Sequence, residues 1–153
     1  MSLFGKLEVD VEIKAPADKF HDVFSRRPHI IPNISPKNVQ GFDLLEGEIG
    51  KEGAIVNWSY THDGVAKVAK DKIEAIDDVN LSITYTVIEG DLKKEFKNFK
   101  VIIKAIPKGE GSVVHLTFEY EKLHQGISDP QTLLDLLVEV TNDIDAYLIQ
   151  AYI

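Results

Sequence analysis

Polar and apolar residues alternate with a period of two along much of the first 120 residues, which is the pattern of half-buried β-strands. The first such run covers residues 3–13, and His62-Asp63-Gly64 is predicted to be a hairpin turn because Asp-Gly tolerates the positive φ angles of tight turns. Later alternating runs cover residues 53–61, 65–76, 81–87, 99–105 and 114–120. Together they predict an antiparallel meander of about seven strands with one buried face.

A long helical period occurs only near the C-terminus, from about residue 130. Its apolar positions are Leu133, Leu137, Val140, Ile144, Leu148 and Ala151, and its polar face carries Asp135, Glu139, Asn142 and Asp143. The helix is predicted to begin either with Asp129 as cap and Pro130 at the first position, or with a capping box of Ser128 and Gln131. About 20 residues give a helix of about 30 Å, long enough to cross a small domain.

A shorter helix is predicted to start at Ala15-Pro16-Ala17-Asp18, with Phe20, Val23 and Phe24 as its apolar stripe. Pro28 and Pro32 interrupt the following stretch, which leaves room for only a short second helix. A sheet with its helices on one face is an α+β arrangement.

Composition narrows the possible functions further. The 153 residues predict one domain, 1–153, and a formal charge of -8 argues against a nucleic acid or an anionic membrane as partner. The sequence has no cysteine, which excludes disulfides, thiolate metal sites and thiol nucleophiles. Neither a secretory signal nor an apolar run long enough for a membrane span is visible, so we expect a cytoplasmic protein without membrane insertion.

Motifs for catalysis or metal binding are weak in this sequence. Gly47, Gly50 and Gly53 form a glycine-rich loop that could cradle a phosphate, but Lys51 is followed by glutamate and a strand, so a hairpin between two strands is the favoured interpretation. The five histidines lack metal-ligand spacing, and no nucleophile elbow is present. We therefore expect no metal, no cofactor and no catalytic residue.

Aromatic residues with a polar tip are the more informative candidates. Trp58, Tyr60, Tyr85 and Tyr147 all fall on faces predicted to be buried. Each brings a polar atom that needs a partner, so these residues belong either to an ordinary core or to the wall of a small-molecule pocket. The residue pattern alone leaves both interpretations open.

Short segments spread over the whole chain resemble the plant major latex proteins of the Bet v I superfamily. They are Phe4-Gly5-Lys6-Leu7, Pro32-Asn33-Ile34-Ser35-Pro36, Gln40-Gly41 through Leu45-Glu46-Gly47, Tyr60-Thr61-His62-Asp63-Gly64, Ala69-Lys70-Asp71 through Glu74-Ala75-Ile76-Asp77, Glu89-Gly90-Asp91-Leu92, Tyr120-Glu121-Lys122-Leu123 and Asp129-Pro130. The resemblance implies a START-like helix-grip fold, in which a curved antiparallel sheet of about seven strands surrounds the long helix and two short helices support it.

The resemblance also implies a large apolar cavity that binds and carries hydrophobic plant metabolites, such as hormone, sterol-like or phenolic compounds, in defence or stress responses. His29 and Ile30 are expected at the cavity entrance, because they lie in the stretch between Pro28 and Pro32, and the protein is expected to be mostly monomeric. The predicted lining residues are Val56, Trp58, Tyr60, Tyr85, Val87, Phe99, Val101, Leu116, Phe118, Leu137, Val140 and Thr141.

Two other functions remain open at this point. Some relatives with this fold catalyse steps of alkaloid biosynthesis with a lysine, a tyrosine and carboxylates inside the cavity, but Lys100 and Lys104 are predicted on the outer face and no inward lysine is apparent. The other alternative is a protein-binding module regulated by a ligand. Carriage without catalysis is the favoured prediction.

Overall fold

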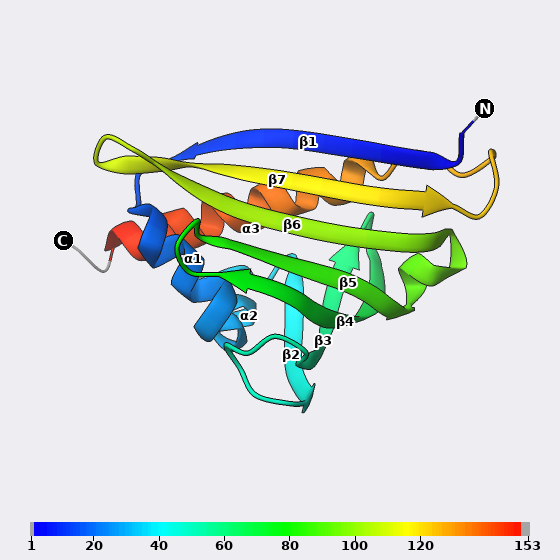
Figure 1. Cartoon of the computed structure of the whole chain (residues 1–153), viewed down its shortest axis with the longest axis horizontal. Coiled ribbons are helices and arrows are strands. Elements are labelled where there is room, and N and C mark those ends of the chain that lie inside the picture. Colours follow the sequence, from blue (N-terminus) through cyan, green and yellow to red (C-terminus); the bar gives the residue numbers. More distant parts are fainter. Residues whose placement is uncertain (1, 151–153) are drawn as a thin grey trace.

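In the computed structural model, which describes residues 2–150, seven strands form one antiparallel sheet in the order β1-β7-β6-β5-β4-β3-β2 (Figure 1). The strands are β1 (Phe4–Ile13), β2 (Val39–Glu46), β3 (Ile55–His62), β4 (Val65–Asp77), β5 (Ser82–Gly90), β6 (Phe96–Lys108) and β7 (Gly111–Lys122). The helices are α1 (Ala17–Arg26), α2 (Ile31–Ile34) and α3 (Gln131–Gln150), with 3-10 turns η1 (Pro28–Ile30) and η2 (Asp91–Lys94). The predicted α+β class and helix-grip arrangement are confirmed.

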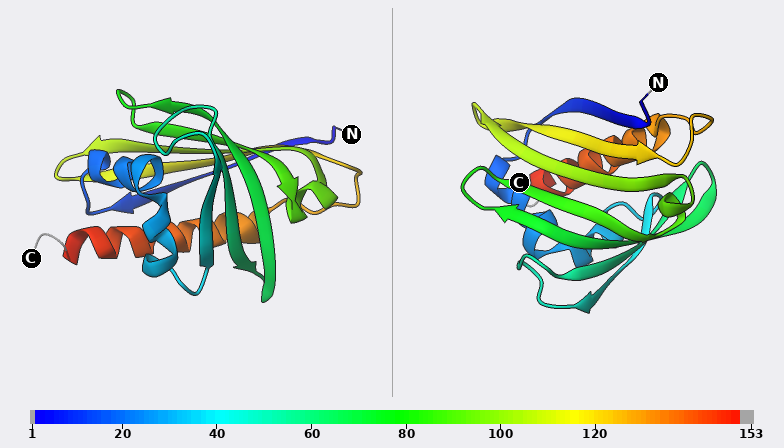
Figure 2. Two further views of the ribbon diagram at one scale, coloured as in Figure 1. Left: turned by 90° about the horizontal axis from the view of Figure 1, so that it is seen from below. Right: turned by 45° about the vertical axis from the view of Figure 1, so that its right-hand side comes forward.

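The helix α3 lies along the inner face of the curved sheet, with α1 and α2 toward its C-terminal end (Figure 2). The first helix is placed by Pro16, whose extended backbone precedes the helix, and it buries the predicted stripe of Phe20, Val23 and Phe24. The chain from β1 through α1 and α2 thus connects the two opposite edges of the sheet.

The alternation correctly predicts the two faces of the sheet. Val56, Leu116 and Ile103 are almost completely buried on the inner face. His115 points outward as predicted, and its ring nitrogens contact Asp10 Oδ1 at 2.5 Å and Glu8 Oε1 at 3.2 Å. These carboxylates raise the pKa of His115, with the hydrogen bond to Asp10 as the larger cause.

Two stretches of the sheet differ from the predicted elements. Strand β6 continues through Pro107 to Lys108. Its pairing with β5 ends at Lys104, so the missing backbone N–H of Pro107 leaves no hydrogen bond to β5 unmade. After β5 the chain forms the 3-10 turn η2, which the alternation does not predict because its four residues are too few for a helical period.

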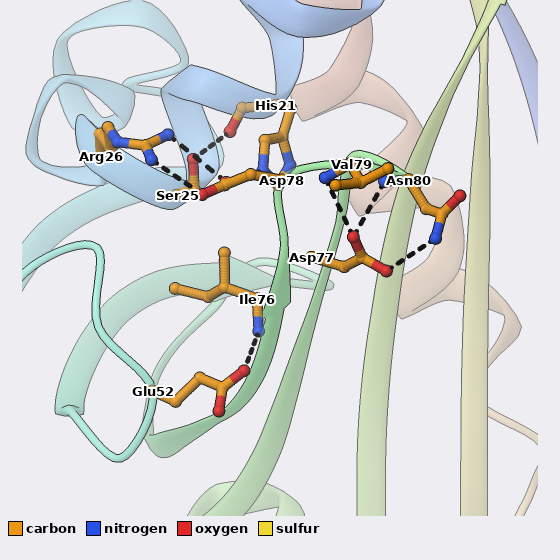
Figure 3. Close-up of polar contacts among 9 residues, drawn as sticks. All are labelled: His21, Ser25, Arg26, Glu52, Ile76, Asp77, Asp78, Val79 and Asn80. Carbon is orange, nitrogen blue, oxygen red and sulfur yellow. Dashed lines mark hydrogen bonds and ion pairs between the residues drawn. The ribbon is translucent and has the colours of Figure 1, made fainter.

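The glycine-rich loop connects β2 and β3, as expected for a hairpin rather than a phosphate loop. Gly47, Gly50 and Gly53 have φ angles of 80°, 84° and 89°. Residues with a side chain disfavour this left-handed region, so glycine at these positions lets the loop adopt its conformation without strain. The adjoining Glu52 accepts a hydrogen bond from the Ile76 amide, which fixes the loop to β4 (Figure 3).

Polar contacts tie α1 to the turn between β4 and β5 (Figure 3). Asp78 Oδ1 lies 2.9 Å from His21 Nε2, and Asp78 Oδ2 lies 2.9 Å from an Arg26 guanidinium nitrogen. These two partners, His21 first, lower the pKa of Asp78. Asp77 closes the same turn by accepting the amides of Val79 and Asn80.

Several predictions about α3 need correction. The helix begins at Gln131, one residue later than the alternative with Pro130 at the first position and two later than a Ser128 cap would give. The Asp129 carboxylate instead contacts Tyr120 and Lys122 on β7. Asp143 does not face solvent but accepts a hydrogen bond of 2.7 Å from Ser35 in the segment after α2. Tyr147, predicted on a buried face, is 41% exposed, whereas the adjacent Leu148 is buried. Ala151 lies outside the described residues.

Candidate ligand-binding site

An apolar pocket of about 130 Å³ lies between the inner face of the sheet and α3. Strands β3 to β6 supply most of one wall, and the N-terminal half of α3 supplies the opposite one. The residues that line it are Phe24, Ile31, Val39, Trp58, Tyr60, Ala69, Asp71, Tyr85, Val87, Leu92, Val101, Ile103, Phe118, Leu133, Leu136, Leu137 and Val140. Such a wall, apolar with a few polar groups, has the composition of a small-molecule site.

The structure brings most of the predicted lining residues together around this pocket. Those on the pocket wall are Trp58, Tyr60, Tyr85, Val87, Val101, Phe118, Leu137 and Val140. The others, Val56, Phe99, Leu116 and Thr141, are buried away from it. Phe99 instead packs in an aromatic cluster, with its ring centroid 5.1 Å from that of Phe96, and Thr141 donates its hydroxyl to the Leu137 carbonyl.

The predicted entrance residues lie outside this wall. His29 is exposed in η1, and Ile30 is half-buried against the core. Neither lines the pocket. Gly47, Gly50 and Gly53 also lie apart from it, in the loop between β2 and β3.

Nine lining residues were not predicted from the sequence, and Asp71 is the charged one among them. It lies on β4, where the lysines at every second or third position obscured the alternation. A strict period of two would have placed Lys67, Ala69, Asp71 and Ile73 on the inner face. The side chain is 6% exposed, and its Oδ1 has no hydrogen-bond partner among residues 2–150. Burial raises the pKa of this carboxyl to about 7.

Two tyrosine hydroxyls lie on the same wall but differ in their bonding. The Tyr85 hydroxyl donates to the Phe24 carbonyl of α1 at 3.3 Å. The Tyr60 hydroxyl is buried and has no partner among the described residues. Burial raises the pKa of Tyr60, and the nearby charges of Asp91 and Asp71 raise it further, so the phenol stays protonated.

A second, polar pocket of about 190 Å³ adjoins the apolar one. It lies among the β3–β4 hairpin, η2 and the start of α3, and the two pockets share Leu92 and Leu133. Here His62 contacts the Thr132 hydroxyl at 2.7 Å, and Lys67 Nζ lies 3.4 Å from the other ring nitrogen of His62. Lys67 is thus an inward-facing lysine that the sequence reasoning did not identify.

Neither a metal centre nor a membrane-crossing helix is found in the part of the chain that the structure describes. Across residues 2–150, no three histidine or acidic side chains are grouped so that they could hold a metal ion. Within the same range, none of the helices combines the length and apolar character needed to cross a membrane. The side-chain oxygen atoms on the wall of the apolar pocket belong to Asp71, Tyr60 and Tyr85, and that of Tyr85 is bonded to the Phe24 carbonyl.

Comparison with known proteins agrees with this geometry. The family model for the pathogenesis-related protein Bet v 1 family matches residues 2–151. The chain is 53% identical over 150 residues to MLP-like protein 28 of Arabidopsis thaliana, covering 97% of this chain and 45% of that protein. It is 52% identical over 150 residues to MLP-like protein 31 of the same plant, covering 97% and 88%. The chain thus spans less than half the length of the first relative and most of the second.

A solved structure extends the likeness to three dimensions. The crystal structure of major latex-like protein 151 from Panax ginseng superposes with a TM-score of 0.92 at 46% identity, covering 95% of this chain and 97% of that one. Fold, sequence and the position of the long helix therefore agree. The chain belongs to the Bet v 1 family of pathogenesis-related proteins and, within it, to the MLP-like proteins.

Proposed function

We propose that this protein binds and carries small hydrophobic molecules in the pocket between the sheet and α3. The observation that carries the proposal is the wall of the pocket, which combines aromatic and aliphatic side chains from the sheet with leucines of α3. Burying an apolar molecule there removes its surface from water, at about 25 cal/mol per Å². Membership of the Bet v 1 family supports a hydrophobic ligand.

The pocket volume defines what fits without rearrangement. An engineered cavity of about 150 Å³ in another protein binds benzene. At about 130 Å³ this pocket accommodates a single ring, and larger ligands of the hormone, sterol-like or phenolic kind require side chains such as Trp58 and Leu137 to move. Both residues are only half-buried, so they have space toward which to move.

The only tryptophan of the chain, Trp58, lines the pocket and therefore reports directly on its occupation. Titration with an environment-sensitive apolar dye is expected to give saturable quenching of Trp58 emission, reversed by a competing apolar compound. Urea-treated protein is the control. Binding that is absent from the folded protein, or that grows as the protein unfolds, contradicts the proposal.

Ligands are proposed to reach the pocket through the adjoining polar pocket. Leu92 and Leu133 are the residues that both pockets share, so they form the boundary to be crossed. Leu92→Trp is expected to slow association of the dye severalfold. Ile30→Trp, at the entrance predicted from the sequence, is the matched control. If this variant alone slows association of the dye, ligands enter near Ile30 and not through the polar pocket.

We propose carriage rather than catalysis. Within residues 2–150 no lysine lines the apolar pocket, and Lys67 lies in the polar one beside His62. The related proteins carry names that refer to the latex protein family. A cytoplasmic role in defence or stress responses completes the proposal. A turnover assay with alkaloid precursors tests the catalytic alternative, and pull-down with and without ligand tests the protein-binding one.

A further inference from the structure

The apolar pocket contains two buried polar groups that the fold leaves unpaired. Asp71 and Tyr60 both line it, and they are 6% and 7% exposed. Neither Asp71 Oδ1 nor the Tyr60 hydroxyl has a hydrogen-bond partner among residues 2–150. A buried polar group without a partner destabilises the folded state, so such groups are rare and need an explanation.

Other buried polar groups around the same core are satisfied. The Tyr85 hydroxyl donates to the Phe24 carbonyl, the Thr141 hydroxyl to the Leu137 carbonyl, and the Ser25 hydroxyl to the His21 carbonyl. The two unpaired groups therefore lie on the neighbouring strands β3 and β4, four register positions apart, and both face the pocket, which provides space for a partner.

We infer that Asp71 and Tyr60 form a polar contact point for a ligand that is apolar except for one hydrogen-bond donor, a hydroxyl or a protonated amine. This inference rests on the proposed function and specifies its ligand class. An ionised carboxylate only accepts hydrogen bonds, so a donor on the ligand can pair with Asp71, and the Tyr60 phenol can donate to an oxygen of the ligand. A hydrogen bond to a charged group is stronger than one between neutral groups.

Charge around this contact point disfavours anionic ligands. Asp91 and Glu95 lie in the adjoining pocket. The pKa of Tyr60 is raised first by burial and then by the charges of Asp91, Asp71 and Glu95. The pKa of Asp71 is raised to about 7, so near neutral pH this carboxyl exists in both protonation states. Both states can pair with a hydroxyl, whereas the ionised state repels a ligand carboxylate.

The test compares ring-sized probes that differ in one group: toluene, p-cresol, benzylamine and benzoate. Binding to the full chain is measured by Trp58 quenching and by amide chemical shifts. We expect p-cresol or benzylamine to bind more tightly than toluene, and benzoate to bind most weakly. The tighter of the first two shows whether the favoured donor is a hydroxyl or an amine.

Three variants assign the preference to the proposed atoms. Asp71→Leu is expected to reduce the preference for p-cresol over toluene tenfold or more while toluene binding persists. Tyr60→Phe should reduce it severalfold. Tyr85→Phe is the matched control, because it removes a hydroxyl that is already bonded to the protein, and it should leave the preference unchanged. Far-UV circular dichroism checks that each variant is folded.

The outcomes separate the inference from the function on which it rests. If toluene and p-cresol both bind but every variant changes the two affinities by the same factor, Asp71 and Tyr60 do not contact the ligand. The pocket then binds through apolar contacts alone, and a water molecule hydrogen-bonds Asp71. Equal binding of benzoate and p-cresol likewise overturns the inference. If no probe binds the parent protein or any variant, the proposed function fails and the inference fails with it.

Discussion

The C-terminal half of α3 packs against α1 and α2, whereas its N-terminal half spans the pocket. In the C-terminal half, Ile144 is completely buried and Leu148 is 3% exposed. In the N-terminal half, Leu136 and Leu137 are half-buried and face unfilled volume. One amphipathic helix thus packs against the core with one half and lines the pocket with the other. Its hydrophobic period is the same in both halves and does not show where the pocket begins.

The carboxylates near the two halves of α3 also differ, in whether they have hydrogen-bond partners. Near the C-terminal half, Asp145 accepts the amides of Lys14 and Ala15, Asp143 accepts the Ser35 hydroxyl, and Asp78 binds α1 side chains. At the pocket, Asp71 is more deeply buried than these and has an oxygen without a partner. Paired acids join elements of the fold, and an unpaired buried acid is available to a ligand.

The largest expected effect concerns packing. Ile144→Ala should lower the free energy of unfolding by about 2–5 kcal/mol, because it opens a new cavity in a filled region. Leu137→Ala removes an equally large side chain beside existing space and should cost clearly less. Urea unfolding of both variants provides the measurement, and equal losses would mean that the two halves of α3 are packed alike.

Asp145→Ala should destabilise the protein by about 1–3 kcal/mol, because it removes the acceptor for the amide of the buried Ala15. Asp145→Asn keeps one acceptor and should lose less. Asp135→Ala, on the exposed side of the N-terminal half, is the control and should change the stability by less than about 0.5 kcal/mol. Thermal and urea unfolding distinguish the three, and an Asp135→Ala loss as large as that of Asp145→Ala contradicts the assignment.

Asp71 should make stability depend on pH in a direction opposite to that of a paired acid. The unfolded chain releases this proton near pH 3.9, and the folded one near pH 7. Between these values the folded state holds a proton that the unfolded state has lost, so stability falls as pH rises, by about 1.4 kcal/mol per pH unit. Asp71→Asn should remove this slope. Its stability relative to the parent is measured by urea unfolding at pH 5.5 and 7, and a pH-independent difference refutes the prediction.

Leu137→Trp should leave stability within about 1 kcal/mol of the parent, because the larger ring enters the pocket, whereas overpacking a filled core costs about 1–3 kcal/mol. The same ring should weaken dye binding about tenfold, or about 1.4 kcal/mol. Melting curves and one dye titration measure both quantities. Lost stability with unchanged affinity would show that Leu137 faces packed core and not the pocket.

Much of the fold could be predicted because alternation is a direct consequence of strand geometry. Trp58, Tyr60 and Tyr85 were placed on the inner face by period alone, and Phe20 and Phe24 by helical spacing. Prediction failed where a tertiary contact decides the outcome. Asp143 looks like a solvent-facing residue until Ser35 is brought beside it by α2, and Tyr147 looks buried although nothing covers it.

The pocket itself was harder to predict because an inward-facing residue can face either packed atoms or empty space. Phe99 and Phe118 lie on neighbouring strands with equally apolar surroundings, yet only Phe118 lines the pocket. Asp71 was overlooked because a charged residue on a lysine-rich strand suggests solvent. Sequence pattern separates inside from outside, but it carries no information on packing density.

The pairing of β1 with β7 has a consequence for how the chain reaches this structure. Phe4 pairs with Glu121 and Ile13 with Ser112, so the first strand contacts one that is synthesised about a hundred residues later. Contacts this distant in sequence form slowly, because the intervening loop must be closed first. Until β7 is available, β1 has no strand partner. Charged side chains disfavour pairing between strand edges of different molecules, and β1 carries Glu8, Asp10 and Glu12 at alternating positions.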